Sequence, residues 1–288
     1  MVKIVNNHGA PEPLIRYAGS KQYDAGSSDF TATSLIDEPR IKILEKRYAD
    51  RIEDDPYLNP WKYLSTIWHS LLCDAAGDGQ IAEERIFTEY EGLTISGAMD
   101  LQTVIKDDDD NLGVTIGDYK FCGSYALNDL SKWTAQLNIY AWLIEREKPH
   151  TKVLGLEVYA FIRDWRMASA ERSSDYPQTP AVTIELPLWS NEERESFVAE
   201  RVAAHVAARR ELPECSHEGR WPSGKLWQVM DGDEVISTHS LKRDATKASA
   251  VEGKEYAIDS TFATYRRCES FCPVSEWCDQ YQVWKEER

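Results

Sequence analysis

Residues 113–122, GVTIGDYKFC, constrain the fold more than any other stretch, because they place an acid and a lysine inside an apolar run. The Val, Thr, Ile, Tyr and Phe residues around them favour a β-strand. Side chains of a strand alternate between its two faces, so Asp118 and Lys120 point one way while Tyr119 and Phe121 point the other. A strand bound for the interior thus carries a carboxylate and an ammonium group on the same face.

The segments on either side of this strand predict an α/β fold with a mixed central sheet flanked by helices. Leu64, Trp68 and Leu71 keep the spacing of an amphipathic helix, and a longer helix of this kind follows the strand. The predicted central order is helix, three strands, helix and strand, over residues 61–76, 84–92, 93–105, 114–121, 128–148 and 153–165.

Composition changes along the chain predict three parts. Residues 1–30 are rich in Gly, Ser and Pro and are expected to form a flexible N-terminal segment. Residues 31–212 are expected to form the main domain. Residues 213–288 are expected to form an extension packed on that domain, with a hairpin turning at 231–233 and a cysteine-rich tail. DDDDNLG, at 107–113, predicts a polar loop between two strands.

The charge balance narrows the classes of function. Acidic residues outnumber basic ones by 49 to 33, for a formal net charge of −16. This argues against a protein that coats nucleic acid through a broad basic face. It leaves a nucleic-acid enzyme open, because carboxylates around a divalent metal are neutralised there. No long apolar window or apolar signal segment is present, so we expect a cytoplasmic protein without a membrane span and with reduced thiols.

Asp100 precedes Asp118 by one strand and follows Gly97, a residue that allows close backbone approach. If the loop at 107–113 closes a hairpin, the two carboxylates and Lys120 lie close together on one face. Such a group suits a hard divalent cation that activates water and polarises a phosphodiester. The alternative is a cross-strand ion pair on a solvated face of the sheet.

Three polar residues on the predicted helices extend this group. Gln136 and Tyr140 are four apart, so they share a helix face. A glutamine on the apolar flank of a helix is unusual without a partner, whereas Tyr140 alone could be part of the core. His69 lies beside the apolar stripe of the 61–76 helix and suits a third metal ligand through a ring nitrogen. A packed or exposed histidine is the simpler reading of that position.

Taken together, these residues resemble the PD-(D/E)XK nuclease superfamily, and within it the RecB-type exonuclease branch with lambda exonuclease and the four-cysteine CRISPR-associated nucleases. The resemblance covers residues 30–165, and phrases such as AQLNIYAWLI, FIRDW and RCESFCPVSEWC look like phage-encoded members. No single motif is specific, but their order is. The motif positions are His69, Asp100 in GAMD, Asp118 and Lys120 in DYK, and Gln136 and Tyr140 in QLNIY.

The resemblance implies a role for each position. His69, Asp100, Asp118 and the backbone carbonyl of Tyr119 would bind Mg²⁺ or Mn²⁺. Lys120 would serve catalysis, while Gln136 and Tyr140 would support the lysine and the substrate phosphate. A glutamate ahead of Asp100 is also common in the family, and Glu84 is the candidate, with Glu83 and Glu89 as competitors. This chain carries Asp118 where many relatives have glutamate.

Cysteines cluster near the end of the chain, at Cys268, Cys272 and Cys278. In a reduced compartment this spacing indicates a metal or iron–sulfur site rather than disulfides. Some RecB-type nucleases hold a [4Fe–4S] cluster, which would need a fourth ligand here, and Cys215 in a loop is favoured over Cys73 and Cys122. Zn²⁺ fits the same ligands, and three merely packed thiols are the remaining alternative.

The sequence therefore predicts a metal-dependent deoxyribonuclease, acting as an exonuclease in phage DNA recombination, repair or processing. Its expected partner is DNA, with a phage recombination or single-strand-annealing protein and a homo-oligomer left open. A non-catalytic nuclease-fold subunit and a metal-dependent hydrolase of RNA or nucleotides are the two alternatives. The setting would be the host cytoplasm if the chain is phage-encoded.

Overall fold

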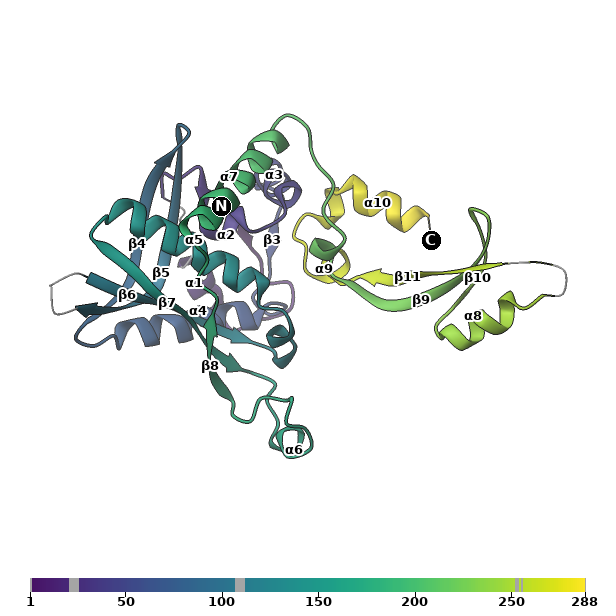
Figure 1. Cartoon of the computed structure of the whole chain (residues 1–288), viewed down its shortest axis with the longest axis horizontal. Helices are drawn as coiled ribbons and strands as arrows, with labels where there is room; N and C mark the ends of the chain where they lie inside the picture. Colours follow the sequence, from purple (N-terminus) through teal and green to yellow (C-terminus); the bar gives the residue numbers. More distant parts are fainter. Residues whose placement is uncertain (1, 21–25, 107–111, 252–253, 255, 288) are drawn as a thin grey trace. The chain divides into compact units, whose positions relative to one another are not determined.

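The chain folds into two units, each built from two separate stretches of sequence (Figure 1). Unit 1 comprises Met1–Asp37 and Glu53–Arg210, and unit 2 comprises Glu38–Ile52 and Glu211–Arg288. The computed structural model describes residues 2–20, 26–106, 112–251, 254 and 256–287. The predicted boundary at 212 lies two residues beyond the second division. The prediction did not include 38–52 in the C-terminal part, and its expectation of packing between the parts stays a prediction.

A six-stranded mixed sheet forms the centre of unit 1, in the order β2-β5-β6-β7-β8 with β4 also paired to β5. The β4–β5, β5–β6 and β7–β8 pairs are antiparallel, whereas β2–β5 and β6–β7 are parallel. Their bounds are β2 Phe30–Thr31, β4 Gln80–Tyr90, β5 Leu93–Lys106, β6 Leu112–Cys122, β7 Thr151–Ile162 and β8 Ala181–Leu186. A separate parallel pair joins β1 (Lys3–Ile4) to β3 (Glu53–Asp54).

Helices cover the sheet and join its strands. Those of unit 1 are α1 Glu12–Ser20, α2 Ala32–Leu35, α4 Pro60–Asp74, α5 Ser131–Glu147, α6 Met167–Ala170 and α7 Asn191–Ala208. The order α4, β4, β5, β6, α5, β7 is the predicted one. A capping box at Ser190 and Glu193 begins α7, with both reciprocal hydrogen bonds present. The mixed α/β class is thus confirmed.

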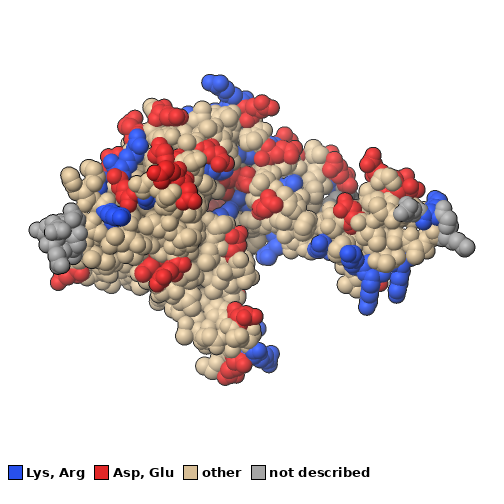
Figure 2. Space-filling view, in the orientation of Figure 1, with Lys and Arg blue, Asp and Glu red and all other residues tan. Residues whose placement is uncertain are grey.

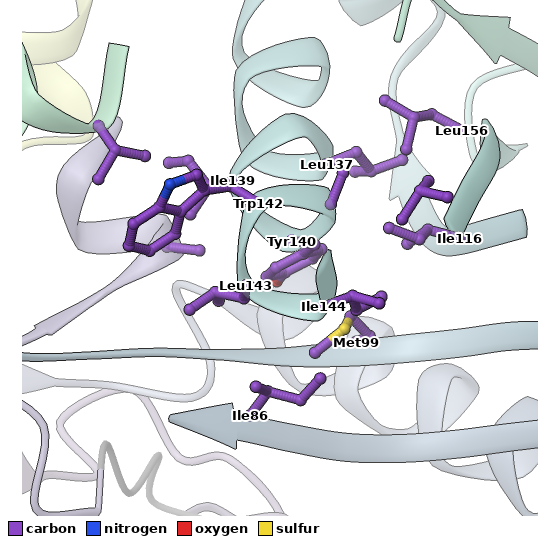
Figure 3. Close-up of a cluster of buried hydrophobic side chains, with 14 of the residues drawn as sticks. Ile86, Met99, Ile116, Leu137, Ile139, Tyr140, Trp142, Leu143, Ile144 and Leu156 are labelled. Carbon is purple, nitrogen blue, oxygen red and sulfur yellow. The ribbon is translucent and has the colours of Figure 1, made fainter. Parts of the chain in front are cut away.

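Helix α5 contributes most of the core, because its residues from Thr134 to Ile144 are buried on every side. Figure 3 shows Leu137, Tyr140 and Ile144 of this helix directed at apolar side chains of the sheet. Burying apolar area on this scale is the main favourable contribution to folding. The helix that carries the predicted Gln136 and Tyr140 is therefore also the helix that the sheet holds most firmly.

Gly97 of β5 lets α5 approach the sheet closely. A Cβ at this position would lie 2.7 Å from Leu143 Cδ1 and 2.7 Å from Tyr140 Cδ1. Real Cβ atoms almost never come that near another carbon, so only glycine fits without a shift of the helix. The close approach expected at Gly97 from the sequence is confirmed.

Helix α4 lies on the opposite face of the sheet from α5. Trp61 packs against Phe121 and Trp68 packs against Phe161, whereas the alternate residue Lys120 contacts α5. The apolar residues whose spacing predicted this helix are only partly covered, since Leu64, Trp68 and Leu71 keep 46%, 41% and 59% of their surface exposed. The periodicity predicted the helix correctly but not its burial.

The predicted flexible segment differs from expectation, and most of the predicted polar loop lies outside the described residues. The segment 1–30, expected to be flexible, carries β1 and α1, and Asn7 and His8 near its start both bind the Asp55 carboxylate. Residues 107–111 of the predicted polar loop fall outside the described part of the chain. Leu112 and Gly113 already belong to β6.

Unit 2 combines a three-stranded antiparallel sheet with short helices. Its elements are α3 Pro39–Arg47, β9 Pro222–Asp231, β10 Glu234–His239, α8 Lys242–Ser249, β11 Ala257–Tyr265, α9 Arg266–Ser270 and α10 Asp279–Glu286. The β9–β10 pair is the hairpin predicted to turn at 231–233. Buried Arg40 of α3 donates to Pro213 O at 2.8 Å and to Cys278 Sγ at 3.4 Å, and also pairs with Asp279. This arginine ties the two stretches of unit 2 together.

Among the described residues, no helix combines the length and apolar character that crossing a bilayer requires.

Replacing Gly97 by alanine is expected to destabilise unit 1, because the added methyl group must push α5 away from β5. Overpacking of this kind costs about 1–3 kcal/mol of the free energy of unfolding, which urea denaturation would measure. Gly155→Ala is the matched control, since a Cβ there meets nothing nearer than 3.6 Å. Equal stability of the two variants would contradict the role of Gly97.

Candidate active site

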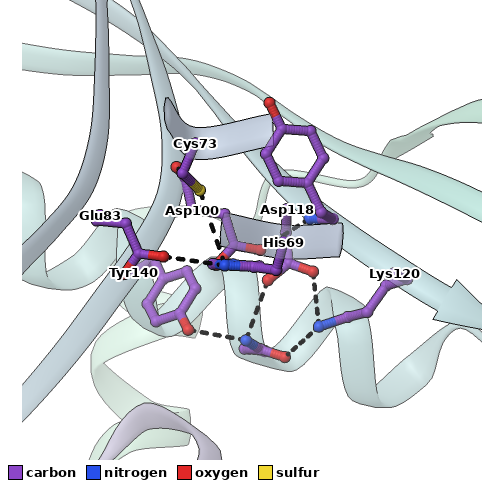
Figure 4. A network of polar contacts seen from close by, with 9 residues as sticks. His69, Cys73, Glu83, Asp100, Asp118, Lys120 and Tyr140 are labelled. Carbon is purple, nitrogen blue, oxygen red and sulfur yellow. Dashed lines mark hydrogen bonds and ion pairs between the residues drawn. The ribbon is translucent and has the colours of Figure 1, made fainter. Parts of the chain in front are cut away.

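A buried carboxylate lies at the centre of a polar network between β6 and α5 (Figure 4). Only 1% of Asp118 is exposed. Its Oδ1 accepts a hydrogen bond from Gln136 Nε2 at 3.2 Å, and Lys120 Nζ lies 2.6 Å from its Oδ2. Gln136 also accepts from Lys120 Nζ through Oε1 at 3.2 Å and donates to Tyr140 Oη at 2.8 Å. The structure therefore brings all four predicted residues together.

Asp100 joins the same network from β5. Its Oδ2 accepts from the backbone N–H of Tyr119 at 2.8 Å, next to Asp118 on the neighbouring strand. Its Oδ1 lies 2.8 Å from His69 Nε2 of α4. The His69 ring also stands edge-on to the Tyr119 ring, with centroids 6.0 Å apart. His69, which the sequence predicted as a metal ligand, thus contacts the Asp100 carboxylate from helix α4.

Glu83, rather than the favoured Glu84, reaches the histidine. Glu83 Oε1 lies 2.9 Å from His69 Nδ1. Glu84 instead accepts from Lys148 Nζ at 2.6 Å and from Gln102 Nε2 at 2.7 Å. Glu83 has φ of +55°, a left-handed conformation that a non-glycine residue rarely adopts. Glu83, which the sequence offered only as a competitor of Glu84, is thus the glutamate that this local departure from strand geometry brings to His69.

Cys73 also lies at this site, one helical turn beyond His69 on α4. Its Sγ is 3.7 Å from His69 Nδ1 and donates to the backbone carbonyl of Asp100 at 3.5 Å. Burial raises the pKa of the Cys73 thiol to about 12, and the neighbouring carboxylates of Glu83 and Asp100 add to the shift. The thiol is therefore protonated at neutral pH unless a cation displaces the proton.

Burial and charge shift the proton equilibria of the network. Loss of hydration raises the pKa of Asp118 to about 6, with Lys120 opposing the shift and Asp100 adding to it. The hydrogen bond to Asp100 raises the pKa of His69 above its ordinary value. Asp118 and His69 thus both bind a proton more tightly than they would in water, and the negative charge around them would also attract a metal ion.

The donor atoms suit a hard divalent cation. Asp118 Oδ2 is fully buried, and the Lys120 ammonium 2.6 Å away is its ion-pair partner. A carboxylate oxygen has more than one lone pair, so Oδ2 can also accept a metal ion beside the ammonium. Carboxylate oxygens from two adjacent strands, a backbone carbonyl and an imidazole match the ligands of Mg²⁺ and Mn²⁺.

The four predicted cysteines of unit 2 line one cavity, which lies wholly within that unit. Cys215 and Cys278 are buried, and Cys268 and Cys272 are partly buried. Burial raises the pKa of the Cys215 thiol to about 12, and the other three thiols add to the shift. Arg40, Arg220 and Arg267 line the same cavity. Thiols gathered beside arginines fit an anionic, thiolate-bound metal group better than simple packing.

Charge is unevenly spread over the surface. Figure 2 shows Asp and Glu side chains over much of one face of unit 1. Lys and Arg side chains instead project from the region of α8, whose sequence includes Lys242, Arg243 and Lys247. The acidic side chains on this face of unit 1 would repel an anionic substrate that approaches it.

Comparison with known proteins adds little to this geometry. No protein-family model matches the sequence, and no curated protein matches it either. The crystal structure of SSO0001 superposes with a TM-score of 0.45 and 16% identity, covering 69% of this chain and 85% of that one. A protein called "Putative exonuclease" from Eubacterium rectale gives a TM-score of 0.33 and 10% identity, covering 68% and 73%. Scores at this level establish no shared fold.

Replacing Asp118 by asparagine is expected to raise the stability of the metal-free protein. A carboxyl whose pKa rises on folding from 3.8 to about 6 destabilises the folded state above that pH. The variant should gain about 3 kcal/mol in the free energy of unfolding at neutral pH. The gain should fade as the pH falls from about 6 toward 3.8, where the wild-type carboxyl is protonated in the folded protein.

Chemical denaturation across this pH range, with EDTA present, measures the effect. The same variant should also lose any stabilisation that Mn²⁺ gives the wild type, since one ligand is gone. A variant less stable than wild type at neutral pH would show that the buried charge is already well compensated.

Proposed function

We propose that this chain is a divalent-metal-dependent deoxyribonuclease, of the RecB-type exonuclease kind that its motifs resemble. One observation carries the proposal: Asp100 and Asp118 come from adjacent strands to one point, with Lys120 held beside them by Gln136. A surface ion pair is a poorer account of this group, because Asp118 is buried and Lys120 is partly buried.

The ligands proposed for Mg²⁺ or Mn²⁺ are the carboxylates of Asp100 and Asp118, the carbonyl of Tyr119 and a ring nitrogen of His69. When bound, such an ion lowers the pKa of a water molecule and polarises the phosphodiester. Asp100 is already oriented by the Tyr119 N–H, so the carboxylate needs little rearrangement to act as a ligand. That preorganisation favours binding, since less side-chain entropy is lost.

Lys120 has the role of orienting the attacking water and stabilising charge that develops on the phosphate. Gln136 Oε1 holds the Lys120 ammonium, and Tyr140 in turn holds the Gln136 amide, so the lysine has a fixed direction. A positioned ammonium is worth more in a site with little water than in solution. Gln136 and Tyr140 therefore act as positioning residues through the lysine.

For unit 2 we propose a [4Fe–4S] cluster bound by Cys215, Cys268, Cys272 and Cys278. Four thiolates around one zinc ion stand about 3.8 Å apart, because Zn–S bonds are about 2.3 Å and tetrahedral. Among the residues that the structure describes, no three of these sulfurs lie within 4.8 Å of one another. The wider spacing favours a cluster, whose iron atoms stand between the thiolates, over a single zinc ion.

Lys120→Ala is expected to reduce Mn²⁺-dependent degradation of end-labelled linear DNA by at least about 100-fold, because one charge-stabilising group is lost. Lys152→Ala is the matched control. Lys152 is an exposed lysine that pairs in register with Gly113, at the other end of β6. Melting curves for both variants would separate lost chemistry from lost folding.

The product pattern identifies the reaction. A ladder that starts at the labelled end indicates an exonuclease, and internal fragments indicate an endonuclease. RNA and nucleotide substrates belong in the same panel. Metal binding without cleavage of any of them would overturn the proposal and leave a non-catalytic DNA-binding subunit.

Cys272→Ser is expected to remove the cofactor of unit 2 and lower its stability more than it lowers catalysis, because metal binding and folding are coupled. Iron and sulfide analysis of anaerobically purified protein, with the visible charge-transfer absorption, would measure occupancy. Cys122→Ser, in unit 1, is the control thiol. Wild-type protein that holds zinc instead, or nothing, would contradict the iron–sulfur assignment.

A further inference from the structure

A second set of donor atoms lies beside the proposed catalytic carboxylates and is different in chemistry. His69, Cys73 and Glu83 each offer one donor atom, and the three atoms lie within 4.8 Å of one another. Within the described part of the chain, no other group of three or more His, Cys, Asp or Glu residues has donor atoms this close together. Imidazole, thiolate and carboxylate together form a borderline-soft donor set, unlike the oxygen ligands of Asp100 and Asp118.

We propose that His69 Nδ1, Cys73 Sγ and the Glu83 carboxylate form a separate binding site for Zn²⁺ or a similar thiophilic divalent ion. The spacing agrees with tetrahedral zinc. Zinc bonds of about 2.0 Å to nitrogen or oxygen and 2.3 Å to sulfur put neighbouring donors about 3.3–3.5 Å apart. The observed separations from His69 Nδ1 are 2.9 Å to Glu83 Oε1 and 3.7 Å to Cys73 Sγ.

The other ring nitrogen of His69 supports this assignment. A zinc-bound histidine nearly always donates its second N–H to a carboxylate, a backbone carbonyl or water, which fixes the orientation of the ring and makes the ligand nitrogen more basic. His69 Nε2 lies 2.8 Å from Asp100 Oδ1. With the proton on Nε2, Nδ1 presents its lone pair to Cys73 and Glu83 (Figure 4).

The backbone at Glu83 is a second, independent feature of the site. The strand ladder pairs Ala82 with Leu101 and Glu84 with Met99, but the residue between them leaves the ladder with φ of +55°. A non-glycine residue in this region costs of order 1–3 kcal/mol and persists where the surroundings hold it. Here the unusual backbone conformation places the Glu83 carboxylate beside His69.

The exposure of the His69 and Glu83 side chains suits an ion that exchanges with solvent. The Glu83 side chain is 55% exposed and that of His69 is 27% exposed, so an ion can enter from solvent. Three protein ligands leave the fourth tetrahedral position to water, as in zinc sites that exchange ligands. Cys73 is buried and supplies the thiol from the helix side.

Occupation of this site would oppose the proposed nuclease activity, a consequence that rests on the proposed function. With zinc on Nδ1, the Nε2 proton stays directed at Asp100, so His69 is lost as a ligand for the catalytic ion. One neutral imidazole cannot bind two ions at once. Thiophilic metals are therefore expected to act as inhibitors of a reaction that oxygen-preferring metals support.

Cobalt binding without DNA tests the site directly. Co²⁺ reports thiolate ligation through a near-ultraviolet charge-transfer band, and the four thiols of unit 2 contribute equally in all variants compared. Cys73→Ser is expected to lose one ion equivalent of this signal relative to Cys122→Ser, the other thiol of unit 1. Glu83→Gln, at an exposed side chain, is expected to keep the fold and weaken binding about tenfold. Identical titrations for Cys73→Ser and Cys122→Ser would overturn the proposal.

A second readout separates this proposal from the nuclease proposal. In Mn²⁺-supported DNA cleavage, the Zn²⁺ concentration for half inhibition should rise at least tenfold in Cys73→Ser relative to Cys122→Ser. If the chain cleaves no substrate, this arm gives no signal, yet the cobalt titration still decides the metal site. Cleavage that zinc inhibits equally in both variants would confine inhibition to the Asp100–Asp118 site and contradict the proposed link.

Discussion

The buried carboxylate of Asp118 is the constraint on which the rest of the site depends. Removing an ionised group from water is unfavourable unless cations and hydrogen bonds replace the lost hydration. Lys120 and Gln136 supply the cation and the hydrogen bond that this charge requires, whereas Asp100 adds a second negative charge beside it. Gly97 lets α5, the helix that carries Gln136, lie close to the strand of Asp100.

Sequence alone predicted the order of elements and the proximity of Asp118 to Lys120 and of Gln136 to Tyr140, because both follow from regular periodicity. Alternation in β6 placed Asp118 and Lys120 together, and the four-residue spacing placed Gln136 with Tyr140. Periodicity could not single out Glu83 from the neighbouring glutamates. Its left-handed backbone departs from strand alternation, and no residue type at that position indicates this conformation. The same limit applies to the prediction of helix α4. The spacing of its apolar residues predicts the helix, but it does not tell whether other elements bury them.

The segments that make up unit 2 were equally hard to predict from the sequence. Residues 38–52 look like a continuation of the main domain, yet their contacts are with residues beyond 210. The cause is a long-range interaction: the Arg40 guanidinium binds Pro213, Cys278 and Asp279, more than 170 residues away. Local patterns carry no information about such a partner. The cysteine spacing, in contrast, pointed to the shared cavity because three of its four members are close in sequence.

Because unit 2 is formed from two separate stretches of the chain, it cannot fold until both have been synthesised. During translation, α3 leaves the ribosome long before the strands and cysteines that complete its core, whereas nearly all of unit 1 has emerged by residue 210. Domains generally fold as they are synthesised, N-terminal parts first. For much of its synthesis the nascent chain therefore carries Ile41 and Leu44, two core residues of unit 2, without their partners. Unit 2 is thus the last part of the molecule to mature, and a cofactor of its cavity can be inserted only after the tail has been made.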